Sequence, residues 1–280
     1  MGHPQIAAFA RVAKENSLPT RLLAGQVTEL SRGAHDIRYD PVHDEIWIAN
    51  PHATAILTFR GAANGPEPPI RIIQGDKTQL QVLDRLDVDV VHNEIFVPDQ
   101  NQVLVFPREA NGNVPPIRVI KGPDTLLRRS KAMAVDPVHN LIAVAAEEGT
   151  GVDRKANVIL FNRTDEGNVK PRAVIRGPRV GSPNSTEHAI GQMQMYPPKG
   201  WIIVTIPGSL YSWDSADWTP FVGIWSINDN GDVPPRWKLG GPKSTLKRPR
   251  GVVLEPKSKE LIVADMHQNA ILTYYFPELF

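Results

Sequence analysis

The sequence has 280 residues, of which 41% are hydrophobic and 22% are charged, and its formal net charge is +1. This length and composition are typical of a globular protein, built either as one repetitive domain or as two ordinary domains. A net charge this close to zero gives no electrostatic reason to expect a nucleic-acid or anionic-membrane partner. The absence of cysteine excludes disulfides, iron–sulfur clusters and thiolate metal sites, so His, Asp and Glu are the remaining metal ligands.

The N-terminal segment, residues 1–17, lacks the long apolar run of a signal peptide, and no later segment is apolar enough to span a bilayer. We therefore expect either a cytoplasmic protein or a secreted one whose leader is absent from this sequence. The partner that we expect is a small-molecule substrate, with no nucleic acid and no membrane. The sequence leaves the oligomeric state open.

Five copies of one motif follow one another along the chain. Each copy has a β-branched and aromatic run, a polar turn, a proline and an arginine, an apolar pair and a closing glycine. The copies are residues 6–25, 56–75, 103–122, 158–177 and 222–241. Such runs, bounded by turn residues, predict strands, so each copy is expected to form two antiparallel strands, which we name c and d.

A second block, made of two apolar runs joined by a turn, precedes four of these copies and follows the last. The blocks are residues 35–50, 86–99, 133–146, 192–206 and 251–265, and the turn often reads Asp-Pro-Val-His. Each block predicts two further strands, a and b, and no segment has the 3.6-residue periodicity of an amphipathic helix. Four short strands in a repeat of roughly 45–60 residues are typical of a β-propeller blade.

The two blocks, V-D-P-x-x-x-E-I-x-V-A-N/D and A-N-G-N-x-P-P-x-R-x-I-x-G, resemble those of the NHL-repeat propeller family along nearly the whole chain. We expect an all-β fold in which residues 1–280 form a single β-propeller domain of five four-stranded antiparallel blades. Six blades are the alternative, because members of that family commonly have six. Pairing of the N-terminal strand at 19–25 with the C-terminal blade is expected to close the propeller and remove a free sheet edge.

Two smaller features repeat with the c–d motif. Asn-Gly turns, at Asn64, Asn111 and Asn230, are interpreted as hairpin chemistry. An arginine in each copy is assigned to the outer strand d, where it is expected to face solvent or to pair locally. These arginines are Arg21, Arg71, Arg118, Arg172 and Arg236.

The topology of a propeller divides the histidines into groups, because the start of strand a and the end of strand b lie on the same face. Three of them, His43, His92 and His139, lie in the a–b turn on the opposite face and are interpreted as turn chemistry. His3 lies in the terminal tail. The other four stand at the start of strand a or the end of strand b: His35, His52, His188 and His267.

Imidazoles that converge at a pocket open to water are the usual ligands of zinc, copper or iron. We therefore predict that His35, His52, His188 and His267 bind one transition-metal ion, whose identity the sequence does not distinguish. His52 and His267 occupy the same position of the repeated frame V/I-A-N/D-x-H-x-x-A-I-L-T. The alternative is that all four are solvated loop side chains without a common role.

Other charged residues fall at equivalent positions on the same face. Asp84, Lys131 and Arg250 stand at the start of strand a, and Glu148 stands at the end of strand b. We take Glu148, Lys131 and Asp84 as catalytic candidates and Arg250 as a substrate-binding candidate. The alternative is that they form structural ion pairs or are solvated loop side chains.

A long loop between strands b and c carries three aromatic residues, Tyr211, Trp213 and Trp218. Their large apolar area and polar tips suit them to close over a small substrate, so they are substrate-binding candidates. The alternative is that they pack the loop onto its own blade.

The predicted function is a metal-dependent enzyme, an oxidoreductase or a lyase, that acts on a small molecule. The amidating lyases of peptide hormone processing are NHL-like propellers that hold zinc with histidines, but their signature motifs are absent here, and the resemblance implies no particular reaction. The alternative is a non-catalytic propeller that binds a peptide, a glycan or a protein on the same face. No phosphate loop, nucleophile elbow, HExxH or EF-hand pattern occurs, so a serine hydrolase or nucleotide enzyme has no support.

Overall fold

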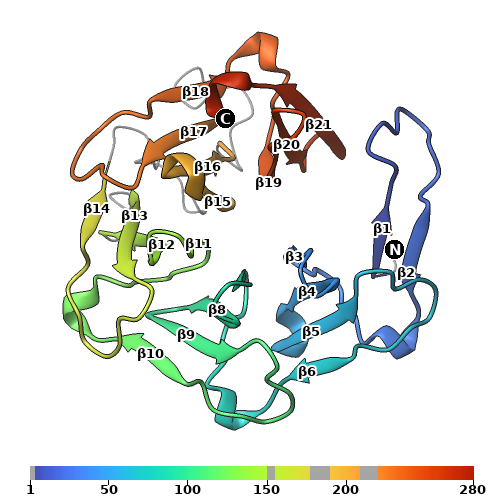
Figure 1. The fold of residues 1–280 in the computed structure, drawn as a ribbon, viewed down its shortest axis with the longest axis horizontal. Coiled ribbons are helices and arrows are strands. Elements are labelled where there is room, and N and C mark those ends of the chain that lie inside the picture. The colour runs from blue at the N-terminus through green and yellow to red at the C-terminus, as the bar shows by residue number, and fades with distance from the viewer. Residues whose placement is uncertain (1–3, 150–154, 177–189, 209–219) are drawn as a thin grey trace. The chain divides into compact units, whose positions relative to one another are not determined.

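The computed structural model describes residues 4–149, 155–176, 190–208 and 220–280 (Figure 1). These residues form β-strands, short 3-10 turns and loops. The prediction of an all-β fold is thereby confirmed. No helix among the described residues is long and apolar enough to cross a membrane.

The chain divides into two compact units, Met1–Asp99 with Val103–Val119 and Gln100–Gln102 with Ile120–Phe280. The first unit holds a two-stranded sheet, a four-stranded sheet and most of a second four-stranded sheet. In chain order its strands are β1 (Gln5–Ala8), β2 (Arg21–Ala24), β3 (Asp36–Asp40), β4 (Glu45–Asn50), β5 (Ala55–Arg60), β6 (Arg71–Ile73), β7 (Asp87–Asp89), β8 (Glu94–Asp99), β9 (Gln102–Pro107) and β10 (Arg118–Lys121).

The second unit holds two four-stranded sheets and a three-stranded sheet. Its strands are β11 (Met133–Asp136), β12 (Leu141–Glu148), β13 (Lys155–Asn162), β14 (Ala173–Ile175), β15 (Met193–Tyr196), β16 (Trp201–Ile206), β17 (Phe221–Ser226), β18 (Trp237–Gly240), β19 (Pro249–Glu255), β20 (Glu260–Asp265) and β21 (Ala270–Tyr275). In both units every sheet joins strands that follow one another in the chain, as in a propeller blade (Figure 1).

The five predicted a–b pairs are all present, as β3–β4, β7–β8, β11–β12, β15–β16 and β19–β20. The prediction of five blades of the β-propeller type is therefore confirmed. The N-terminal hairpin, β1 with β2, forms a two-stranded sheet of its own, and β19, β20 and β21 form a three-stranded one. Closure of the propeller through these strands stays a prediction, as does the single domain.

Consecutive sheets within a unit bury their apolar faces against each other. In the first unit the core includes Trp47, Ile56, Ile95 and Phe106, and in the second it includes Leu160, Ile202 and Trp225, all at most 1% exposed. These side chains alternate along their strands with residues of the opposite face, because side chains of a strand point alternately to its two faces. The alternation is what fixes the register of each sheet.

The three Asn-Gly turns link the β3–β6, β7–β10 and β15–β18 sheets to the sheet that precedes each of them, a role beyond the predicted hairpin chemistry. Asn64, Asn111 and Asn230 each accept a hydrogen bond of 2.9 Å, from the backbone N–H groups of Leu22, Ile72 and Val174 in the outer strand of the preceding sheet. The adjoining glycines form parallel bridges with the same strands, as in Leu23–Gly65 and Ile73–Gly112. We call this contact the Asn–Gly clasp.

The strand-d arginines pair locally where predicted, but two of them lie outside the strand. Arg71 and Arg118 begin β6 and β10 and form ion pairs of 2.7 Å with the carboxylates of Glu45 and Glu94. Arg21 likewise begins β2, whereas Arg172 and Arg236 precede β14 and β18. Their backbone N–H groups bond to Leu160 and Ile224, the role that Ile70 and Ile117 have in the earlier repeats. The assignment of Arg172 and Arg236 to strand d was therefore wrong by one residue.

Candidate functional site

His35 and His52 both lie beside Gly33, in loops at one end of the β3–β6 sheet. His35 immediately precedes β3, and His52 lies in the 3-10 turn Pro51–Ala53 that follows β4. The point that a Cβ atom on Gly33 would occupy is 3.2 Å from Nε2 of His52 and 3.6 Å from Nε2 of His35. Both imidazoles are exposed to solvent, and both turn the same nitrogen toward one point.

The ring of His35 is held at its other nitrogen. Nδ1 of His35 is hydrogen-bonded to a carboxylate oxygen of Asp84, and the Arg85 guanidinium donates to the carbonyl of His35. The His35 backbone N–H donates to the carbonyl of Ala49 at 3.3 Å. When a carboxylate accepts the Nδ1 proton, the lone pair of a neutral imidazole stands on Nε2, which is the form that binds a metal.

Asn50, the last residue of β4, joins the two histidine loops. Its Oδ1 accepts the backbone N–H of Ser31 at 3.0 Å, and its Nδ2 donates to the carbonyl of Glu29 at 2.9 Å. Asn50 is fully buried, so water does not compete for these bonds. The segment that leads to Gly33 and His35 is thus held against the strand that leads to His52.

This arrangement can supply two imidazole ligands to zinc, copper or iron, which bind such nitrogens at about 2.0–2.1 Å. Within the ranges that the structure describes, no group of three or more His, Asp and Glu side chains could hold a metal ion. Of the four predicted ligands, the structure brings His35 and His52 together. His188 lies outside the described residues.

His267 belongs to the second unit and has, on its own sheet, the place that His52 has on the β3–β6 sheet. It follows β20, is exposed, and its backbone N–H donates to Oδ1 of Asp265 at 3.1 Å. The same carboxylate accepts the N–H groups of Lys247 and Arg248 at 2.8 and 2.9 Å. Asp265 therefore holds its loops as Asn50 does, in agreement with the repeated N/D-x-H frame.

The histidines of the a–b turns have the role that the sequence predicted for them. Nδ1 of His43, His92 and His139 is 2.7, 2.8 and 2.7 Å from a carboxylate oxygen of Asp40, Asp89 and Asp136, three residues earlier in each turn. Burial would raise the pKa of Asp40, but the hydrogen bonds from His43 and from the backbone N–H groups of the turn lower it overall. These pairs stabilise the turn.

Glu148, a catalytic candidate, is held in place by two neighbours. Its Oε2 accepts from Nδ2 of Asn157 at 2.9 Å and from Nε of Arg176 at 3.1 Å. These contacts, that with Asn157 foremost, lower the pKa of Glu148. The carboxylate is therefore ionised at neutral pH, and it is a weaker proton acceptor than a free one.

The remaining candidates are spread over the second unit. Lys131 lines a hollow of about 20 Å³ with Arg129 and Glu147, room for about one water molecule. Arg250 lies in β19 and is half-buried. The aromatic residues Tyr211, Trp213 and Trp218 lie outside the described residues.

The sequence did not predict three parts of this site: Gly33, Asn50 and the pairing of Asp84 with His35. Only Asn50 carried a signal, because it shares its place in the repeated frame with Asp265. The crowding at Gly33 and the contact with Asp84 depend on how two loops fold over a sheet end.

No family model and no curated protein matches this sequence. Solved structures of similar fold include hydrazine synthase of Kuenenia stuttgartiensis, with a TM-score of 0.60 and 13% identity over 91% of this chain. A candidate 6-phosphogluconolactonase of Bacteroides fragilis has a TM-score of 0.55 and 16% identity, also over 91% of this chain. The chain spans 66% and 68% of the lengths of these two proteins. At such identities the likeness establishes the fold alone.

Proposed function

We propose that this protein is a metal-dependent propeller enzyme that acts on a small molecule, as an oxidoreductase or a lyase. The observation that carries the proposal is the convergence of the Nε2 atoms of His35 and His52 beside Gly33. The carboxylate of Asp84 on Nδ1 of His35 supports it, because metal-bound histidines regularly donate their other N–H to a carboxylate. Membership of the NHL-repeat family is part of the same proposal and is supported by the two repeated blocks.

The donor set fits copper, iron or zinc, since neutral imidazole suits all three. Two imidazoles leave coordination positions for a substrate and for further ligands, for which His188 and His267 stay the predicted candidates. When bound, such a metal would polarise a substrate oxygen or act as a redox centre. In this proposal His35 and His52 hold the ion, and Asp84 orients the ring of His35.

The other candidates are proposed to act on the substrate. Arg250 would bind it, with Tyr211, Trp213 and Trp218 covering it, and Lys131 and Glu148 would move protons or orient its polar groups. The fold is shared with two proteins that carry enzyme names, hydrazine synthase and a candidate 6-phosphogluconolactonase. That likeness is compatible with an enzyme but names no substrate.

The test is metal analysis of protein that has been purified without a histidine tag and titrated with copper, iron and zinc in turn. We expect stoichiometric binding of one of the three by the wild type, and at least about tenfold weaker binding by His35→Ala and by His52→Ala. His139→Ala is the matched control, because that imidazole pairs with Asp136 in a turn.

Protein that binds none of the three metals would overturn the proposal and leave the non-catalytic propeller that binds a peptide, glycan or protein. Binding that survives in both His35→Ala and His52→Ala would overturn the assignment of the ligands.

A further inference from the structure

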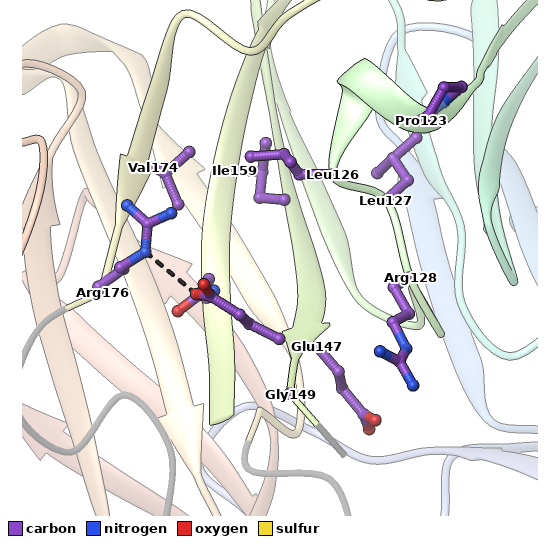
Figure 2. A pocket seen from close by; sticks show the side chains of 11 residues that line it. Pro123, Leu126, Leu127, Arg128, Glu147, Gly149, Ile159, Val174 and Arg176 are labelled. Carbon is purple, nitrogen blue, oxygen red and sulfur yellow. Dashed lines mark hydrogen bonds and ion pairs between the residues drawn. The ribbon is translucent and has the colours of Figure 1, made fainter. Parts of the chain in front are cut away.

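A pocket of about 290 Å³ lies in the second unit, on the β11–β14 sheet (Figure 2). Its volume is near the lower limit of the ~300–1,000 Å³ that small-molecule sites occupy. Neither His35 nor His52 lines it. Its wall comes from the ends of β12, β13 and β14 and from the segment 123–128 that precedes β11.

The pocket arises where this repeat departs from the others. Strand b of three other blades ends in a buried Asn or Asp, namely Asn50, Asp99 and Asp265, whose side chain bonds to the segment before strand a. In the β11–β14 sheet the equivalent residue is Ala146, which has no polar group to reach that segment.

Instead of ending there, the strand continues. β12 and β13 have eight residues each, against six in the b and c strands of the other blades, and the two added pairs are Glu147–Ala156 and Glu148–Lys155. The extension places Glu147 and Glu148 over the segment 123–128. The pocket lies between the extended strand end and this segment.

A second departure lines the same pocket with an apolar side chain. The residue after the 3-10 turn that precedes strand a has a left-handed backbone in the four repeats whose turn the structure describes. These residues are Glu29, Gln79, Leu126 and Thr245, with φ from 56 to 61°. Three of these residues are polar. Leu126 is a large apolar residue in a conformation that disfavours it, and the residue is 47% exposed and lines the pocket.

The lining combines an apolar wall with a cation, Arg128, that has no partner among the residues that the structure describes. Leu126, Leu127, Ile159 and Val174 form the wall, and Arg128 and Arg176 lie on opposite sides of it (Figure 2). Arg176 is paired with Glu148 at 3.1 Å, and Glu147 is paired with Arg129 at 3.3 Å. The Arg128 guanidinium is exposed and has no hydrogen-bond or ion-pair partner among the described residues.

We infer that this pocket binds a small organic carboxylate with an apolar body the size of a phenyl ring or a short alkyl chain. The carboxylate pairs with the guanidinium of Arg128, which a planar anion can engage through two hydrogen bonds. The apolar body packs on Leu126, Leu127 and Val174. Both carboxylates of the pocket are already paired with arginines, so the remaining charge at the site is positive.

The test is a titration of metal-free protein with phenylacetate and with its neutral isostere phenylacetamide, followed by NMR of the leucine, isoleucine and valine methyl groups. We expect phenylacetate to bind with millimolar affinity, to shift the signals of Leu126, Leu127, Ile159 and Val174, and to bind at least about tenfold more tightly than phenylacetamide. Metal at the histidines plays no part, so the outcome does not depend on the proposed function.

Two variants and a control sharpen the test. Arg128→Gln should weaken phenylacetate binding at least about tenfold and make the acid and the amide equal. Leu126→Asn should weaken binding of both without loss of stability, because Asn tolerates the left-handed backbone. Arg172→Gln, a change of an exposed arginine outside the pocket, should bind as the wild type does.

Three outcomes would overturn the inference. They are equal affinity of the wild type for acid and amide, unchanged binding by Arg128→Gln, and absence of binding at tens of millimolar.

Discussion

Gly33 is the residue on which the geometry of the two imidazoles depends. Its φ of +76° disfavours a side chain, and a Cβ there would press on Nε2 of His52. We expect Gly33→Ala to separate the Nε2 atoms of His35 and His52 and to weaken metal binding at least about tenfold, with a loss of about 1 kcal/mol in unfolding free energy. Metal titration and urea unfolding measure the two effects.

Gly65→Ala is the matched control for this variant. Gly65 has a similar φ of +68°, but a Cβ there would meet nothing within 4 Å. It should show the loss of stability with metal binding unchanged. If Gly33→Ala binds metal as tightly as Gly65→Ala, the crowding at Gly33 has no part in the site.

Asp40 gives the stability of the protein a defined dependence on pH. Its pKa in the folded protein is below the usual 3.8, since the bonds from His43 and the turn backbone outweigh the effect of burial. A lowered folded pKa stabilises the fold above the unfolded value and loses that contribution as the pH falls through the folded value. We expect Asp40→Asn to cost roughly 1–3 kcal/mol at pH 7 and progressively less below pH 3.8.

Urea unfolding of wild type and Asp40→Asn between pH 7 and pH 3 measures this difference. A difference in unfolding free energy that stays constant over the whole range would show that the charge of Asp40 does not contribute.

At the scale of the element, the last residue of strand b decides how firmly two loops are held. Asp265 is 2% exposed and accepts the backbone N–H groups of Lys247, Arg248, His267 and Gln268 at 2.8 to 3.1 Å. Asp265→Ala would leave these donors without their acceptor, and we expect it to lower the unfolding free energy by roughly 2–4 kcal/mol.

Asp265→Asn retains one acceptor oxygen and should cost less than Asp265→Ala. Chemical unfolding of both variants measures the order. A cost for Asp265→Ala within about 0.5 kcal/mol of zero would mean that water replaces the lost bonds. The repeat with Ala146 shows a different solution, since there the backbone N–H of Glu147 donates to the carbonyl of Arg128 at 2.8 Å.

The elements were largely predictable, because β-branched and aromatic runs bounded by turn residues are local signals. The block at 86–99 contains β7 and β8, and the block at 251–265 contains nearly all of β19 and all of β20. Arg172 and Arg236 stand one residue further from the closing glycine than Arg71 and Arg118 do, and this places them before the strand.

At the scale of the whole molecule, the sequence predicted which loops lie on the same face, but it did not predict which side chains contact one another there. Topology placed His35 and His52 at the same end of one blade, and the structure brings them together. The contact of Asp84 with His35 could not be predicted from the sequence, because it depends on packing between neighbouring sheets. The substitution of Ala146 for Asn or Asp was visible in the repeats, but the pocket beside it required the strand extension as well.

The Asn–Gly clasp sets the order in which the repeats can be completed as the chain is made. The outer strand β6 has its last partners at Asn111 and Gly112, about one repeat further along. A chain that leaves the ribosome N-terminus first therefore holds its newest outer strand unfinished until the next hairpin has emerged. Synthesis that stalls within a repeat would expose one strand edge of that blade, and shortening the chain by a whole repeat would move the exposed edge to the blade before it.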